Sequence, residues 1–246
     1  MADGINGEED QARWLREADR GELLGWLAEN APGLDLRRVR QILLNPFTDH
    51  EVLAVLLAVP HLVKSPEVRK ALVAHPRTPE AAALGLVGTL FWHDLLDLAA
   101  DLRVPPAVRH AAERYLIERL VGLTEGERVT LARRASTAVL TRLRLDPSPR
   151  VIAAMLENGR LTEGQLLPML ASDSTPPEVL ALVAGSRWGL RYEVKVALAR
   201  NRRTPVVTVL MILPHLRESD LRVVMADPRL AMPVRHAARQ RLFSRD

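Results

Sequence analysis

The sequence predicts an all-α fold, a right-handed α-solenoid of short, stacked helix pairs. Three observations lead to this prediction: a long internal duplication, repeated dipeptides that mark helix starts, and apolar residues spaced as on a helix. No stretch alternates apolar and polar residues with the period of two that a half-buried strand requires, so we expect no strands. Many short helices with separate start signals are typical of a stacked array.

The duplication joins two segments of the same length. Residues 71–116 align without a gap on residues 197–242. Both copies contain Arg-Thr-Pro near the start, Asp-Leu and Ala-Asp in the middle, and Val-Arg-His-Ala-Ala near the end. Shorter echoes recur elsewhere every 25 to 45 residues or so, which is roughly the period of helix-pair repeats. The chain therefore contains duplicated structural units.

Hydroxyl residues followed by proline predict where helices begin. A Ser or Thr side chain can accept hydrogen bonds from the free amides of the first turn, and proline fits the first helical position because its missing N–H has no partner there. These pairs are Ser65-Pro66, Thr78-Pro79, Ser148-Pro149, Thr175-Pro176 and Thr204-Pro205. Reciprocal capping boxes are expected at Thr48 with Glu51, Thr124 with Glu127, Thr162 with Gln165, and Thr175 with Glu178.

The N-terminal segment does not match the repeat. We expect residues 1–34 to form an acidic tail and two short helices between Glu8 and Glu29 that cap the exposed core of the first repeat. Docking onto another protein is the alternative for this segment. Residues 35–246 are predicted to form the solenoid.

Two related repeat families are similar to parts of the chain. The runs 227–238 and 146–151 resemble HEAT-like repeats, which have Asp-Pro, a short turn, then Val-Arg and alanines. The runs 192–205 and 42–48 resemble the leucine-rich repeat variant. Together the matches cover most of residues 35–243. The resemblance implies an α-solenoid but no particular function, because such folds host many unrelated roles.

Composition excludes several classes of site. The 246 residues include no cysteine, so disulfides, thiolate zinc sites, cysteine nucleophiles and the iron–sulfur cluster of the variant family are excluded. We expect no cofactor and no metal. The N-terminus has no signal-peptide pattern, and the longest apolar stretch, 52–63, is shorter than the roughly 20 residues of a membrane span. We therefore expect a cytoplasmic protein of bacterial type with no membrane contact.

Two recurring features are interpreted as structural. Asp101 with Arg109 and Asp227 with Arg235 stand at the same spacing, which favours a contact that ties one repeat to the next. His110 recurs as His236, and neither has a second metal ligand three or four residues away. We interpret both histidines as structural residues.

Residues that differ between the copies are the candidate functional residues. Phe91, Trp92 and His93 stand where the second copy has Arg217, Glu218 and Ser219. An exposed Phe-Trp pair could anchor a protein partner, and the alternative is a hydrophobic staple in which one ring folds onto the following helix.

The second copy is also more basic. Residues 1–130 hold 15 Lys and Arg against 20 Asp and Glu, whereas residues 131–246 hold 19 against 10. A cationic surface for phosphates or an acidic partner is one interpretation, and a solvated surface rich in arginine is the alternative. The candidate residues for this surface are Arg191, Lys195, Arg200, Arg202, Arg203 and Arg217.

No specific catalytic motif is present, so we do not expect an enzyme. The sequence predicts a non-enzymatic scaffold that binds another macromolecule on a curved helical surface. A protein is the favoured kind of partner. The alternative is a nucleic-acid or phosphate-binding module that uses the Arg-rich C-terminal half. The partner's identity and the oligomeric state do not follow from the sequence.

Overall fold

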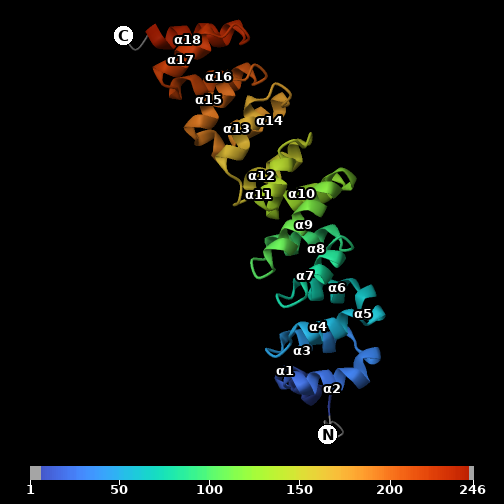
Figure 1. Cartoon of the computed structure of the whole chain (residues 1–246). Coiled ribbons are helices and arrows are strands. Elements are labelled where there is room, and N and C mark those ends of the chain that lie inside the picture. The colour runs from blue at the N-terminus through green and yellow to red at the C-terminus, as the bar shows by residue number, and fades with distance from the viewer. Residues whose placement is uncertain (1–6, 244–246) are drawn as a thin grey trace. The chain divides into compact units, whose positions relative to one another are not determined.

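The protein is built from helices alone in the part that the structure describes. The computed structural model covers residues 7–243, and over this range the chain forms 18 α-helices, four short 3-10 helices and no strand (Figure 1). The prediction of an all-α fold is confirmed. The chain divides into two compact units, residues 1–121 and 122–246, and each is described by itself.

In the first unit, each helix packs mainly on helices close to it in the sequence. Contacts join α1 to α3, α2 to α4, α3 to α6, α7 to α9, and α8 to α9. Leu23, Leu27, Leu53, Leu56 and Leu72 are fully buried between these helices. The helices are α1 (Glu8–Glu17), α2 (Arg20–Asn30), α3 (Leu36–Leu44), α4 (His50–Leu57), α5 (Pro60–Lys64), α6 (Pro66–Ala74), α7 (Glu80–Val87), α8 (Trp92–Ala100) and α9 (Pro106–Arg119).

The second unit uses the same kind of short-range packing. Here α10 packs on α12, α12 on α14, α13 on α15, α16 on α18, and α17 on α18. Its helices are α10 (Glu125–Arg134), α11 (Thr137–Leu143), α12 (Pro149–Glu157), α13 (Glu163–Ala171), α14 (Pro177–Gly185), α15 (Tyr192–Arg200), α16 (Val206–Ile212), α17 (Glu218–Ala226) and α18 (Met232–Phe243). The 3-10 helices are η1 (Ala31–Gly33), η2 (Leu120–Gly122), η3 (Arg187–Leu190) and η4 (Leu213–His215).

The helices of the two duplicated segments have matching bounds. Helix α15 begins and ends 126 residues after α6, and α17 begins and ends 126 residues after α8. Helices α16 and α18 begin at the same offset from α7 and α9. The sequence duplication thus corresponds to a repeated series of four helices within the described residues.

A four-residue turn recurs where helices end. It comprises His75–Thr78 and Asp101–Val104 in the first unit, and Asn201–Thr204 and Asp227–Leu230 in the second. In each turn, the first side chain accepts a hydrogen bond from the backbone N–H of the third residue. The backbone N–H of the fourth residue donates to the carbonyl of the first. This geometry fixes the direction in which the next helix leaves.

Buried asparagines connect the ends of α3, α12 and α15 to earlier parts of the chain. Asn45, Asn158 and Asn201 each donate two hydrogen bonds from the side-chain amide to backbone carbonyls 23 to 31 residues earlier. All three side chains are almost fully buried. Because an unsatisfied carbonyl in such a place would be costly, each asparagine stabilises the contact between successive layers of helices.

The threonines before the prolines act differently from the prediction. The Thr78 and Thr204 hydroxyls donate to carbonyls six residues earlier, at 2.5 and 2.6 Å, and do not cap the following helix. Thr48 and Thr175 make the same backward bond, so the capping boxes expected at these two residues are absent. A buried threonine can satisfy a free carbonyl at the end of the preceding helix, where water has no access. The boxes at Thr124 and Thr162 and the Ser65 cap are confirmed.

The predicted contact between Asp101 and Arg109, and its equivalent at Asp227, is wrong. Asp101 pairs with Arg103 at 2.8 Å, and Asp227 pairs with Arg229 at 2.8 Å. Each arginine is two residues away within the same turn, so it reaches the carboxylate without crossing to another helix. Hydrogen bonds from Arg103 lower the pKa of Asp101 to about 2, and those from Arg229 do the same for Asp227.

Both recurrent histidines lie on the surface. His110 and His236 are exposed. His110 Nδ1 lies 3.2 Å from a carboxylate oxygen of Glu113, whereas the equivalent of Glu113 in the second copy is Arg239. Neither ring is part of the core, so recurrence of a residue within a repeat did not imply burial.

Candidate functional site

The predicted aromatic anchor lies at the start of α8. Phe91 is the residue before the helix, and its side chain is 54% exposed. The His93 ring stacks on Phe91, with centroids 5.7 Å apart and planes inclined by 21°. Trp92 is half-buried and meets His93 edge-on at 5.9 Å. The structure therefore brings the three residues together as one cluster, of which Phe91 and His93 are the exposed part.

Next to this cluster lies a charged group that the sequence prediction missed. Lys70 of α6 binds Asp94 at 3.0 Å and Asp97 at 2.6 Å, both of α8. Burial lowers the pKa of Lys70, but the hydrogen bonds and charges of the two carboxylates outweigh it, so the pKa lies above its usual value. Asp94 is only 6% exposed, and its charge is therefore compensated within the protein. The group connects α6 to α8.

The second copy has a different arrangement at the same place. Tyr192 donates a hydrogen bond of 2.5 Å to Asp220, which is the equivalent of Asp94. The Arg217 guanidinium lies 4.4 Å from the centre of the Tyr192 ring. Burial and the hydrogen bond to Asp220 raise the pKa of Tyr192. Thus Arg217 stacks on a tyrosine, where the first copy has an exposed phenylalanine.

The predicted basic residues do not form a single patch. Arg191 precedes α15, and Arg200 is its last residue. At 1.5 Å per residue, these two positions lie about 13 Å apart along the helix axis. Arg217 stacks on Tyr192 and so shares the end of α15 where Arg191 lies, with the half-buried Lys195 one turn further on.

Acidic groups accompany the basic residues at the other end of α15. The Arg202 side chain pairs with Asp173 at 3.3 Å, and Arg203 donates to the backbone carbonyl of Asp173. Two of the three exposed arginines at this end therefore bind Asp173, in the turn after α13. This leaves less free positive charge than the sequence indicates.

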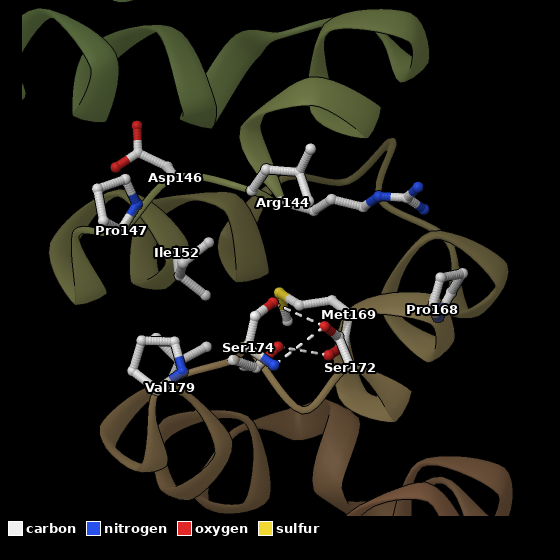
Figure 2. Close-up of a pocket in the computed structure, with 12 residues that line it drawn as sticks. Arg144, Asp146, Pro147, Ile152, Pro168, Met169, Ser172, Ser174 and Val179 are labelled. Carbon is white, nitrogen blue, oxygen red and sulfur yellow. Dashed lines mark hydrogen bonds between the residues drawn. The ribbon is translucent and has the colours of Figure 1, made fainter.

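A pocket of about 420 Å³ lies within the second unit (Figure 2). The segment after α11, the turn after α13, and parts of α12, α13 and α14 surround it. Its volume is within the usual range of small-molecule sites, roughly 300–1,000 Å³. The lining residues are Arg144, Leu145, Asp146, Pro147, Ile152, Pro168, Met169, Ser172, Ser174, Thr175, Pro176 and Val179.

The two charged residues of this pocket differ in their surroundings. Asp146 binds Arg128 at 2.6 Å and also accepts a hydrogen bond from the backbone N–H of Ser148. Figure 2 shows its carboxylate turned away from Ile152 and Met169. Arg144 is half-buried, and its guanidinium makes no hydrogen bond or ion pair with any residue between 7 and 243. The pocket therefore has one uncompensated positive charge.

A second hollow and an apolar stripe lie on alternate helices of the same unit. Between α12 and α14 there is a shallow groove of about 720 Å³. On α16, Val207, Leu210 and Met211 are 70%, 39% and 71% exposed, and their spacing places them on one face. The groove is lined mainly by Ala153, Leu156, Glu157, Ala181, Leu182, Gly185, Ser186 and Arg187.

Sequence reasoning missed both the pocket and the stripe. The lining residues of the pocket are spread over 36 positions between Arg144 and Val179, and no local pattern connects them. The stripe had a signal in the alignment of the two copies. Val207 and Met211 correspond to Ala81 and Gly85, so the second copy has larger apolar side chains there. This gain in apolar volume distinguishes α16 from α7.

Comparisons with family models, with curated proteins and with solved structures find no match to this chain. Between residues 7 and 243, no three His, Asp or Glu side chains gather as a metal ion would require. Over the same range, no helix is long and apolar enough to cross a membrane.

Proposed function

We propose that the chain is a non-enzymatic α-solenoid scaffold that binds another protein on the outer face of α16. The observation that carries this proposal is the exposed stripe of Val207, Leu210 and Met211. Three large apolar side chains on one face of a helix are costly to leave in water and are typical of a surface that a partner covers. The repeated helices and turns support the solenoid part of the proposal, and so does the resemblance to HEAT-like and leucine-rich-repeat-variant proteins.

The groove between α12 and α14 is a second observation in favour of this partner-binding surface. Counted from the first residue of each helix, Ala153, Ala181 and Leu210 all hold the fifth position of α12, α14 and α16. The groove and the stripe therefore lie at corresponding positions of α12, α14 and α16, which alternate with α13 and α15 along the chain. The small side chains Ala153 and Ala181 on α12 and α14 would leave room for a partner helix, and the large side chains on α16 would anchor it. We assign the partner the chemistry of an amphipathic helix with an apolar face.

Site-specific photo-crosslinking tests this function. A photoreactive residue is placed at position 211 in one variant and at the matched position 85 in another. Each purified chain is then irradiated in a lysate of the source organism. We expect a crosslinked protein at position 211 only. That protein, once purified, is expected to bind the wild-type chain and to lose about tenfold or more in affinity for Met211→Asp.

A control for this substitution is Ala81→Asp, which adds the same charge to the equivalent face of α7, four residues from the matched Gly85. The control is expected to leave the affinity unchanged. Equal crosslinking at positions 85 and 211, or equal affinity of Met211→Asp and wild type, would contradict the assignment to α16.

The alternative function is nucleic-acid or phosphate binding through the C-terminal half. It is favoured by Arg200, whose side chain is exposed at the end of α15 beside the arginines of the following turn. Fluorescence-anisotropy titrations with DNA and RNA at two salt concentrations distinguish the two functions. Binding that falls steeply with salt, and that is lost when Arg200, Arg202 and Arg203 are changed to Glu, would favour this alternative.

A further inference from the structure

We propose that the pocket between α11 and α14 binds a carboxylate that carries an apolar group. The pocket has a cation at its edge that is unpaired in the described part of the chain. Arg144 is half-buried at the edge of the pocket, and no carboxylate between residues 7 and 243 pairs with it. The one acidic residue of the lining, Asp146, is neutralised by Arg128. A ligand that enters the pocket therefore meets a net positive charge.

The lining of the pocket is largely apolar. Ile152, Met169 and Val179 come from three different helices and are buried around the pocket. Four further apolar side chains line it: Leu145, Pro147, Pro168 and Pro176. Figure 2 shows Arg144 across one side of the pocket and Ile152 and Val179 on the other. A ligand that is apolar at one end and anionic at the other matches this division.

Two serine hydroxyl groups of the lining form a hydrogen-bonded pair. The Ser172 and Ser174 side-chain oxygens lie 2.7 Å apart, and the Ser174 backbone N–H donates to Ser172. Because only one of the two hydroxyls can donate to the other, the second keeps a hydrogen for another acceptor. The Thr175 hydroxyl, in contrast, is used by the Met169 carbonyl. The serine pair thus offers one more donor to a ligand oxygen.

A guanidinium binds carboxylates through two parallel hydrogen bonds, and these are stronger where water is partly excluded. The ligand's carboxylate would pair with Arg144 while its apolar group displaces water from Ile152, Met169 and Val179. Such a ligand could be a small free acid or the C-terminal residue of a bound chain, and both present the same chemistry. The inference does not depend on protein binding by α16, because none of these residues lies on that helix.

The test is a methyl NMR titration of the full chain with the methyl groups of Ile, Val and Met labelled. The free-acid arm uses 3-phenylpropionate and its neutral amide. The peptide arm uses a short peptide that ends in Phe, with either a free or an amidated C-terminus. We expect the methyl signals of Ile152, Met169 and Val179 to shift with at least one acid, and its neutral partner to bind about tenfold more weakly or worse.

Arg144→Gln and Arg144→Glu test the role of the charge. Arg142→Gln is the control, because it removes the same charge from an exposed position of α11 outside the pocket. We expect affinity to fall about tenfold or more in both Arg144 variants and to be unchanged in the control, with all circular dichroism spectra alike. Shifts with the free acid alone, or with the peptide alone, identify the source of the ligand and support the site.

Three results would overturn the inference. One is the absence of shifts at the pocket methyl groups with either acid at millimolar concentration. Another is equal binding of the acid and its amide. The third is an equal effect of the substitutions at Arg144 and Arg142. Failure of the photo-crosslinking at position 211 would leave the inference intact.

Discussion

The two duplicated segments share their turns and differ in their surfaces. In both, the four-residue turns have the same side-chain-to-backbone hydrogen bonds. The exposed faces diverge. The first copy has Phe91 where the second has Arg217, and it has Ala81 where the second has Val207. Because one chain contains both copies, each position in one serves as a control for its equivalent in the other.

This difference teaches which residues maintain the architecture and which are free to acquire a function. A turn that satisfies buried backbone groups tolerates few side chains, since any loss leaves carbonyls without partners. An outward helix face has no such constraint. The large apolar side chains on α16 therefore need an explanation other than stability.

The largest effect is expected at the buried asparagine of the second copy. Asn201 makes two hydrogen bonds to earlier carbonyls, at 2.7 and 3.0 Å, and accepts a third at 2.8 Å. Asn201→Ala should lower the free energy of unfolding by about 2–4 kcal/mol, because buried carbonyls lose their partners. Urea denaturation followed by circular dichroism measures the change. The equivalent His75→Ala should cost less, about 1–2 kcal/mol, since this ring is only half-buried. Equal losses would contradict the comparison.

The next effect is expected where the copies use different partners for the same aspartate. Lys70→Met leaves the buried Asp94 without its cation and should cost about 1–3 kcal/mol, a range reduced here because Lys70 is partly exposed. Tyr192→Phe removes two hydrogen bonds at a partly exposed site, one to Asp220 and one from the Arg217 backbone N–H, and should cost about 0.5–1.5 kcal/mol. Denaturation of both variants under the same conditions ranks them, and a larger loss for Tyr192→Phe would contradict the account.

Much of the architecture could be predicted from the sequence. The duplication and the absence of alternating patterns were sufficient to predict an all-α chain, and Pro66 and Pro149 mark helix starts as expected. The role of the threonines could not be predicted, because a hydroxyl before a helix can bond forward to an amide or backward to a carbonyl. Thr78 bonds backward because the end of α6 is buried beside it. Burial of this kind depends on packing that no short motif encodes.

The candidate sites were harder to predict. The sequence alignment identified Phe91 as exceptional, and the structure places it at the surface. The pocket around Arg144 was not predictable, because whether an arginine finds a carboxylate depends on which helices meet. Arg144 is only two residues from Asp146 in the sequence, yet Asp146 pairs with Arg128, and the Arg144 guanidinium has no partner in residues 7–243.

A smaller effect concerns pH and distinguishes His75 from its counterpart Asn201. Burial lowers the pKa of His75, the charge of Arg77 lowers it further, and the Leu43 backbone opposes the change. The folded chain therefore binds this proton less tightly than the unfolded chain, in which the pKa is near 6.5. Stability from neutral His75 is present above that value and is lost as the pH falls through the folded-state pKa.

Denaturation at about pH 7 and about pH 5 tests this sign. We expect the free energy of unfolding to decrease toward the lower pH in the wild type, and the decrease to be smaller in His75→Asn. His236→Asn, at an exposed position, is the control and should keep the wild-type slope. An unchanged slope in His75→Asn would contradict the assignment.

The smallest effect is expected at the half-buried aspartates of the turns. By NMR titration, Asp101 and Asp227 should each titrate with a pKa of about 2. Arg103→Ala should return the pKa of Asp101 toward its usual value and leave that of Asp227 in place. The reverse should hold for Arg229→Ala. A shift at both aspartates in either variant would show that the pairs are not confined to their own turns.

The most direct test of the central claim truncates the face of α16 toward that of the first copy, where Ala81 and Gly85 hold the equivalent positions. The double variant Val207→Ala, Met211→Ala removes the large apolar side chains and keeps good helix-forming residues. Its affinity for the protein recovered by crosslinking at position 211 is the decisive measurement. The account predicts a loss of about tenfold or more in affinity, with a free energy of unfolding within about 1 kcal/mol of wild type. Unchanged affinity in this variant would contradict the claim that the second copy carries the binding face.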